Sequence, residues 1–215
     1  MNIKGTIRVI SLNSAALCVL LLSGALTVCA QPSMKIKKND NSYTNIKISE
    51  IDTITFGYAI GDTALGGVVF YVDGTGWHGL VAAPADQGTM AWTPGGQTDC
   101  NASYDGLYYG TWNTDNIVFY YQQSGTYAAY SCYAKSLGGY TDWYLPSKYE
   151  LNLLFEQRSV VGGFTNDVYF SSSDNPEWPE EQVWAQFFYD GGYGNGYQFL
   201  GSQGQSFRVR AIRAF

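Results

Sequence analysis

The segment from Gln182 to Phe207 has the composition of a binding surface rather than of a catalytic centre. Its 26 residues contain eight aromatic side chains and six glycines, but only one charge, Asp190. Aromatic side chains give a large contact area at low entropic cost, while Asn, Gln, Gly and Ser supply adaptable hydrogen bonds. The stretch from Tyr189 to Gln198 is predicted to be a glycine-punctuated loop, where binding residues concentrate. The candidate ligand-binding residues are Trp184, Gln186, Tyr189, Asp190, Tyr193, Asn195, Tyr197 and Gln198.

Some aromatic residues of this segment are predicted to serve the core instead. Residues 183–189 are predicted to form a strand, and aromatic residues in strands are more often core than site. Phe187 and Phe188 are therefore assigned to the core, whereas Trp184 fits either role. A second aromatic group, in another long loop, can face the same surface as the first. It consists of Tyr104, Tyr108, Tyr109 and Trp112.

Residue types suited to catalysis or metal binding are sparse. The single histidine, His78, lies in a glycine-rich turn, so no nucleophile–base set can be assembled. A carbohydrate-active hydrolase that pairs Asp174 with Glu177, Glu180 or Glu181 is the alternative hypothesis, because a glycosidase needs two carboxylates across a cleft. The run from Asp174 to Glu177 (DNPE) also offers hard oxygen ligands for calcium. Otherwise we predict no metal, no cofactor and no catalysis.

The first 30 residues are predicted to be an export signal. Lys4 and Arg8 precede a mostly apolar stretch interrupted by small polar residues, which is typical of such a signal rather than of a transmembrane anchor. The export signal can be cleaved at either of two positions. Cys29 follows a lipobox-like sequence and would then be lipidated, whereas cleavage after Ala30 would release a soluble exported protein, which we favour.

The two cysteines beyond the signal, Cys100 and Cys132, are predicted to form a disulfide, because an even pair in an oxidising compartment usually does. The composition also limits the partners. Charged residues make up 14% of the chain, and its formal net charge is -6. Nucleic acid is not expected as a partner, because no basic stripe is present to neutralise phosphates. Arg208, Arg210 and Arg213 are expected to lie on a sheet face or to pair with carboxylates rather than to bind sulfate.

Two parts follow the signal. Residues 31–57 are predicted to form a small β module, with a hairpin at 34–37 and 45–48 and a third strand at 53–56. Residues 58–215 are predicted to form one α+β domain with a twisted, mainly antiparallel sheet, two or three helices and long loops. Its predicted strands are 66–72, 79–83, 169–173, 183–189 and 207–215. Its predicted helices are 113–123, capped by Asn113 or Thr114, then 126–137, and 148–158 with a capping box of Ser147 and Glu150.

Several ordered motifs of the main domain resemble the Lcl-type C-terminal domain family of exported bacterial proteins. They are GGVVFY at 66–71, HGLVAAP at 78–84, DWYLPS at 142–147, SSS at 171–173 and VRAIR at 209–213. The resemblance implies a C-type lectin-like fold and a role in adhesion or glycan binding. Related lectin-like folds include receptors with a diversified C-terminal segment. They also include formylglycine-generating oxidases, whose paired reactive cysteines have no counterpart here.

Together these observations predict an exported, non-catalytic binding or adhesion module. It would act outside the cell, on the cell surface or in the periplasm of a bacterium, with a glycan or a surface protein as its ligand. A structural surface-assembly subunit, in which residues 33–56 donate a strand, is a further alternative.

Overall fold

The computed structural model describes residues 41–47, 57–96, 98–122, 125–189, 191 and 194–215, and the backbone of 33–37. The chain divides into two compact units, Met1–Phe56 and Gly57–Phe215. In the first unit, β1 (Ser33–Lys37) pairs with β2 (Tyr43–Lys47) in an antiparallel hairpin, which confirms the predicted pair of strands. The predicted strand at 53–56, the export signal and Cys29 lie outside the described residues.

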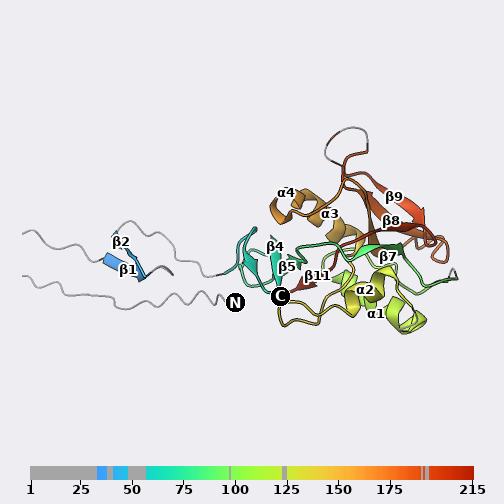
Figure 1. The fold of residues 1–215 in the computed structure, drawn as a ribbon, viewed down its shortest axis with the longest axis horizontal. Coiled ribbons are helices and arrows are strands. Elements are labelled where there is room, and N and C mark those ends of the chain that lie inside the picture. The colour runs from blue at the N-terminus through green and yellow to red at the C-terminus, as the bar shows by residue number, and fades with distance from the viewer. Residues whose placement is uncertain are drawn as a thin grey trace, which may run out of the picture. The chain divides into compact units, whose positions relative to one another are not determined.

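The second unit contains two sheets and four helices within its described residues (Figure 1). The five-stranded sheet has the order β6-β10-β7-β8-β9, and the four-stranded sheet has the order β11-β5-β4-β3. Only β10 and β7 run parallel among the described strand pairs of this unit. The strands are β3 (Thr63–Ala64), β4 (Gly67–Val72), β5 (Gly79–Ala82), β6 (Gly88–Ala91), β7 (Val168–Asp174), β8 (Gln182–Phe187), β9 (Gln198–Ser202), β10 (Ser206–Val209) and β11 (Ile212–Ala214).

The α+β class is therefore confirmed, but the single predicted sheet and its last strand are not. The predicted strand at 207–215 is divided at Arg210 and Ala211, so that β10 joins the five-stranded sheet and β11 joins the four-stranded one. Ile212 also forms an isolated bridge with Tyr144. The shift of the apolar pattern at Ile212 marks the point where the chain passes from one sheet to the other.

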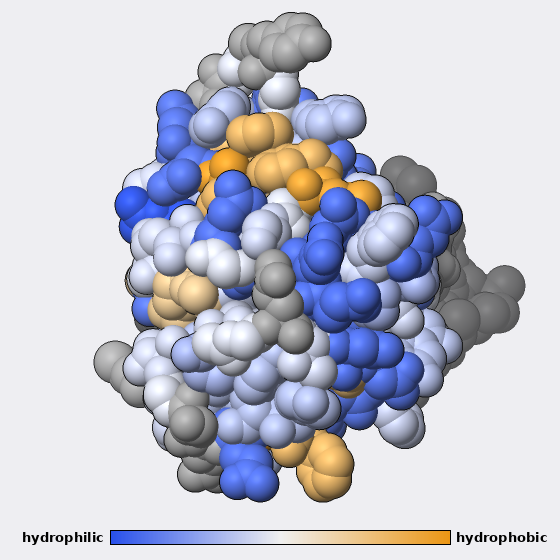
Figure 2. All heavy atoms as spheres, turned by 90° about the vertical axis from the view of Figure 1, so that its right-hand side faces the viewer, coloured by the Kyte–Doolittle hydropathy of each residue, from blue (hydrophilic) through white to orange (hydrophobic). Residues whose placement is uncertain are grey.

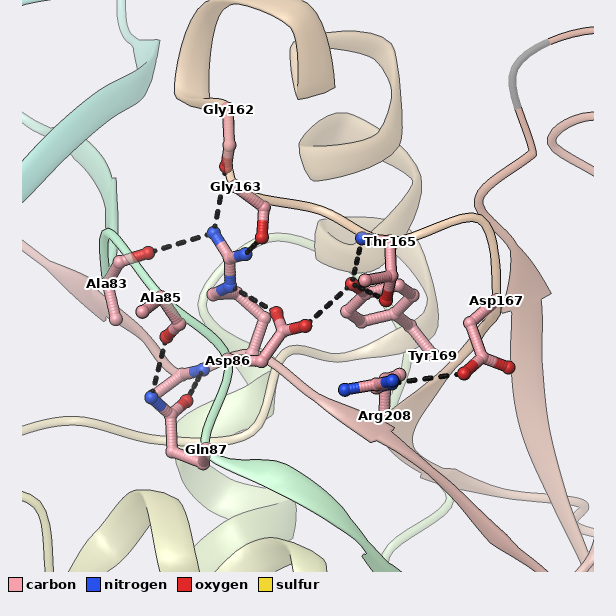
Figure 3. Close-up of polar contacts among 12 residues, drawn as sticks. Ala83, Ala85, Asp86, Gln87, Gly162, Gly163, Thr165, Asp167, Tyr169 and Arg208 are labelled. Atoms are coloured by element: carbon pink, nitrogen blue, oxygen red, sulfur yellow. Dashed lines mark hydrogen bonds and ion pairs between the residues drawn. The ribbon is translucent and has the colours of Figure 1, made fainter.

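Arg210 holds this crossing in place from inside the protein. Its guanidinium is buried and donates to Asp86 Oδ1 at 2.7 Å, to the carbonyls of Ala83 at 3.0 Å and Gly162 at 3.2 Å, and to the Gly163 carbonyl at 2.6 Å (Figure 3). The other oxygen of Asp86 accepts from the Tyr169 hydroxyl on β7 at 2.8 Å. Pairing with a carboxylate is one of the two roles predicted for this arginine, and the bond to Asp86 shows that it applies here.

The two neighbouring arginines are paired as well. Arg208 donates to Asp167 at 3.0 Å, and Arg213 donates through two nitrogens to both oxygens of Asp142 at 2.8 Å. The bidentate geometry is the strong form of such a pair. These contacts confirm that the three C-terminal arginines are occupied by carboxylates.

The helices differ from prediction at their beginnings and ends. The described elements are α1 (Tyr109–Tyr121), α2 (Ala128–Tyr133), α3 (Lys148–Glu156) and the single turn α4 (Arg158–Val161). The capping box of Ser147 and Glu150 is confirmed. However, there are four helices rather than two or three, and α2 is half as long as the predicted helix at 126–137. No helix of the described residues is long and apolar enough to cross a bilayer.

The helix α1 begins four residues before the predicted cap because its cap comes from another element. Glu150 Oε1 accepts from the Tyr108 N–H at 2.8 Å, and Oε2 accepts from the Gly110 N–H at 3.2 Å. Asn113 and Thr114, the predicted caps, are buried inside α1 and bond to neighbouring segments instead. The carboxylate of Glu150 thus caps α3, in which it lies, and α1 as well.

Two apolar clusters fill the domain. One gathers Trp92, Ile117, Trp143 and Val183, and includes α1, α2 and the inner face of the five-stranded sheet. The other gathers Phe70, Leu151 and Phe188 between α3 and β4. Leu151 and Leu154 are buried as the helical spacing predicted, and Phe155 is half-buried beside them. The assignment of Phe188 to the core is confirmed.

We expect Glu150→Gln to destabilise the protein strongly. Both Glu150 oxygens accept two donors each, from Tyr108 N and Tyr144 Oη on one side and Gly110 N and Ser147 N on the other. An amide nitrogen in place of either oxygen would face two N–H or O–H donors, which should lower the free energy of unfolding by about 2–4 kcal/mol. Urea denaturation of both proteins measures this. Glu156→Gln, the same change at an exposed carboxylate of α3, should cost less, and an equal cost for both variants would contradict this role of Glu150.

Candidate functional site

The candidate site is the outer face of the hairpin formed by β8 and β9, together with the loop that connects these strands. In the antiparallel register, Trp184 lies opposite Leu200 and Gln186 lies opposite Gln198. Directly opposite residues share a face of a sheet. These four side chains therefore share one face, whereas Ala185 and its partner on β9 point to the other.

Gln186 is fully buried and fixes the hairpin to α3. Its Nε2 donates to Asn152 Oδ1 at 2.8 Å and to the Gly196 carbonyl at 3.0 Å. Its Oε1 accepts from Gln198 Nε2 at 3.3 Å, and the same nitrogen donates to the Lys148 carbonyl at 2.8 Å. The prediction that Gln186 contacts the ligand is corrected by this burial: its amide groups position the surface instead.

Trp184 is half-buried and carries a cation on its ring. Lys148 Nζ, from the first turn of α3, lies 3.4 Å from the ring centroid. Such a cation–π contact orders both side chains. The ammonium group leaves a hydrogen-bond donor beside an aromatic ring at the surface, which is a combination suited to a hydroxyl-rich ligand.

The connecting loop presents Tyr197 to solvent. Tyr197 is 63% exposed and Asn195 is exposed, while Tyr189 is half-buried with its ring 5.1 Å from that of Phe187. Gly196 has φ +74°, and a Cβ there would collide with the Phe155 ring, so the loop lies close against α3. Asp190 and Tyr193 lie outside the described residues.

The second predicted aromatic group is exposed too. The rings of Tyr104 and Tyr109 stack with centroids 5.6 Å apart and an interplanar angle of 12°. Trp112, one turn along α1, is 65% exposed, whereas Tyr108 is half-buried. We call the surface made by Tyr104, Tyr109 and Trp112 the helix platform.

The predicted calcium ligands do not converge. Asp174 is buried, and its Oδ2 accepts from the Ala102 N–H at 3.2 Å. The Asn175 amide bonds to Gln182 Oε1 at 2.9 Å, and Glu177 is exposed. Glu180 and Glu181 are exposed as well. The part of the chain described by the structure contains no group of three or more His, Cys, Asp or Glu residues that could hold a metal ion.

The predicted disulfide is not formed in the structure. Cys100 and Cys132 are both free and buried, as small apolar members of the same core cluster. Cys100 Sγ donates to the Thr98 carbonyl at 3.5 Å. Burial raises the pKa of each thiol to about 12, so neither is an ionised nucleophile at neutral pH.

Comparisons with known proteins do not assign the site. No family model matches the chain, and no curated protein matches it.

We expect Asp174→Asn to stabilise the protein at neutral and alkaline pH but not at pH 4. Burial raises the pKa of the Asp174 carboxyl from 3.8 to about 7, and nearby Asp99 adds to the rise. Between about pH 4 and pH 7 the unfolded chain loses a proton that the folded protein keeps, so folding becomes less favourable as the pH rises. The amide removes this penalty, which should increase the free energy of unfolding by about 1–2 kcal/mol at pH 8 and by almost nothing at pH 4.

Urea denaturation at several pH values, with and without calcium, measures the Asp174 effect. Asp99→Asn, on the nearby loop, serves as the matched control and should give a smaller change. A less stable Asp174→Asn variant at pH 8, with a difference that calcium enlarges, would contradict the expectation and assign Asp174 to a cation site.

Proposed function

We propose that this protein is an exported, non-catalytic adhesion module that binds glycans through the outer face of the β8–β9 hairpin. The observation that carries the proposal is the Trp184 ring with the Lys148 ammonium group over it, on a hairpin that is tied to α3 and whose connecting loop exposes Tyr197. Aromatic rings that are fixed in place can contact the apolar face of a sugar, while amides and an ammonium group bond to its hydroxyls. The proposal includes a C-type lectin-like fold and export from the cell, both of which the family resemblance implies.

The side of the domain that carries the hairpin is mostly polar, with one apolar patch. Figure 2 shows the side of the domain on which β8, β9 and α1 lie in Figure 1. Most of it is pale or blue, while orange residues gather mainly near its upper end, at the level of β8 and β9 in Figure 1, with smaller orange groups at the left and at the lower edge. Obligate protein interfaces are more apolar than this.

The placement of the carboxylates supports a role without catalysis. Asp174 is buried, whereas Glu177, Glu180 and Glu181 are exposed. A glycosidase needs two carboxyl groups that flank one cleft. None of these four residues lines the pocket at Arg158 and Phe164 or the pocket at Thr93 and Pro94.

We expect Tyr197→Ala to weaken glycan binding about tenfold, which corresponds to about 1.4 kcal/mol. The side chain is 63% exposed and its removal leaves the backbone bonds of the loop in place, so the fold should persist. The measurement is a glycan and surface-protein array with the purified exported protein, with and without calcium, followed by titration of the hits. Tyr133→Ala, an exposed tyrosine on α2, is the matched control. Unchanged binding by Tyr197→Ala would contradict the proposed site.

A further inference from the structure

The helix platform is an aromatic surface for which the hairpin site alone gives no role. Tyr104 and Tyr109 stack with nearly parallel rings, and Trp112 continues the surface one helical turn away. Residues three apart on a helix are neighbours on its surface. Farther along α1, Phe119 is 87% exposed. So many exposed rings on one element need an explanation, because large exposed apolar side chains that gather on a surface usually mark an interaction site.

Hydrogen bonds place the helix platform next to the hairpin face. The Ser173 hydroxyl, at the end of β7, accepts from the Lys148 N–H at 3.0 Å and donates to the Tyr104 carbonyl at 2.8 Å. The side chain of Lys148 lies over Trp184. Ser173 therefore bonds both to the backbone of the residue that contacts Trp184 and to the backbone of Tyr104 in the helix platform. The backbones of Lys148 and Tyr104 therefore lie close together, which brings the helix platform near Trp184.

Tyr149 comes from the same turn of α3 that joins the two surfaces. It follows Lys148, its side chain is exposed, and its N–H donates to Asp105 Oδ1 at 2.7 Å. Asp105 in turn follows Tyr104. Trp184, Tyr149 and the helix platform thus come from segments that Ser173 and Asp105 join by hydrogen bonds, and we call these rings the row.

This row is a surface rather than a pocket. Two pockets among the described residues lie elsewhere: one is lined by Arg158, Phe164 and Phe188, and the other by Thr93, Pro94 and Gly204. A site that recognises the end of a sugar chain must enclose the terminal residue. An open row of rings can instead contact successive residues within a chain.

The charged residues near the row disfavour a polyanion as the ligand. Lys148 is the single cation among the residues that form it, and it is engaged with the Trp184 ring. Asp105 and Asp115 are exposed near the helix platform, and the whole chain carries a formal net charge of -6. Sulfated or carboxylated polymers would meet repulsion here, whereas an uncharged polymer would not.

We propose that the hairpin face and the helix platform together bind one extended, uncharged polysaccharide chain along its length. This inference rests on the proposed function and specifies its ligand class. Contacts with successive sugar residues act as linked binding events, so affinity should rise with chain length even though each contact is weak.

The test is calorimetric titration of the purified exported protein with the disaccharide and the hexasaccharide of three uncharged polymers: cellulose, xylan and mannan. At least one hexasaccharide should bind about tenfold or more tightly than its disaccharide. The double variant Tyr109→Ala, Trp112→Ala should reduce the affinity for that hexasaccharide to nearly the level of the disaccharide, while binding of the disaccharide stays unchanged. Trp77→Ala, at a 57% exposed tryptophan in the β4–β5 hairpin, should change neither.

Three results would overturn the inference. They are equal affinity for the disaccharide and the hexasaccharide, unchanged hexasaccharide binding by the double variant, and binding of charged glycans or proteins alone. Tyr197→Ala, measured in parallel, separates this inference from the proposed function. If Tyr197→Ala abolishes glycan binding and the platform variant does not, the proposed function stands and the extended site is wrong. If neither variant affects binding, both are wrong.

Discussion

The buried guanidinium of Arg210 is the constraint on which the arrangement of the two sheets depends. A buried cation must have its N–H groups paired, because an unpaired one would cost far more than its neighbours could offset. The partners of Arg210 come from the segment after β5 and from the turn after α4, and its ring contact is with Phe164. The chain can therefore pass from β10 to β11 only if these two loops remain close to the Arg210 guanidinium.

The hairpin face depends on this frame through α3. The turn that supplies carbonyls to Arg210 directly follows α4, and α4 continues from α3. Along α3, Lys148 and Asn152 bond to Gln198 and Gln186 and so fix the hairpin. A surface whose side chains are already ordered loses less conformational freedom when a ligand binds. The order of the aromatic face is therefore obtained during folding rather than during binding.

Features encoded by neighbouring residues were predicted well from the sequence. The β4–β5 hairpin follows from the turn residues at 73–76, and the start of α3 follows from the capping box of Ser147 and Glu150. Features that depend on distant partners were not predicted. The division of the last strand requires the loops around Arg210.

The candidate site shows the same division. The aromatic composition alone indicated that Tyr197 and Trp112 lie at the surface, and both are exposed. Aromatic residues in a polar segment indicate a binding surface even when their distant neighbours are not known. The burial of Gln186 could not be predicted, because its partner Asn152 lies on α3. The free thiols of Cys100 and Cys132 could not be predicted either, because the number and spacing of cysteines do not show whether their sulfur atoms meet in the folded core.

The capping of α1 by Glu150 has a consequence for the order in which the protein folds. The first turn of α1 has N–H groups that only a residue about 40 positions later in the chain can satisfy. During synthesis α1 emerges first, yet its beginning stays uncapped until α3 has formed and docked against it. Contacts of such long sequence separation form late and slow the overall reaction. The helix platform, which begins at that same turn, would thus be among the last parts of the surface to take shape.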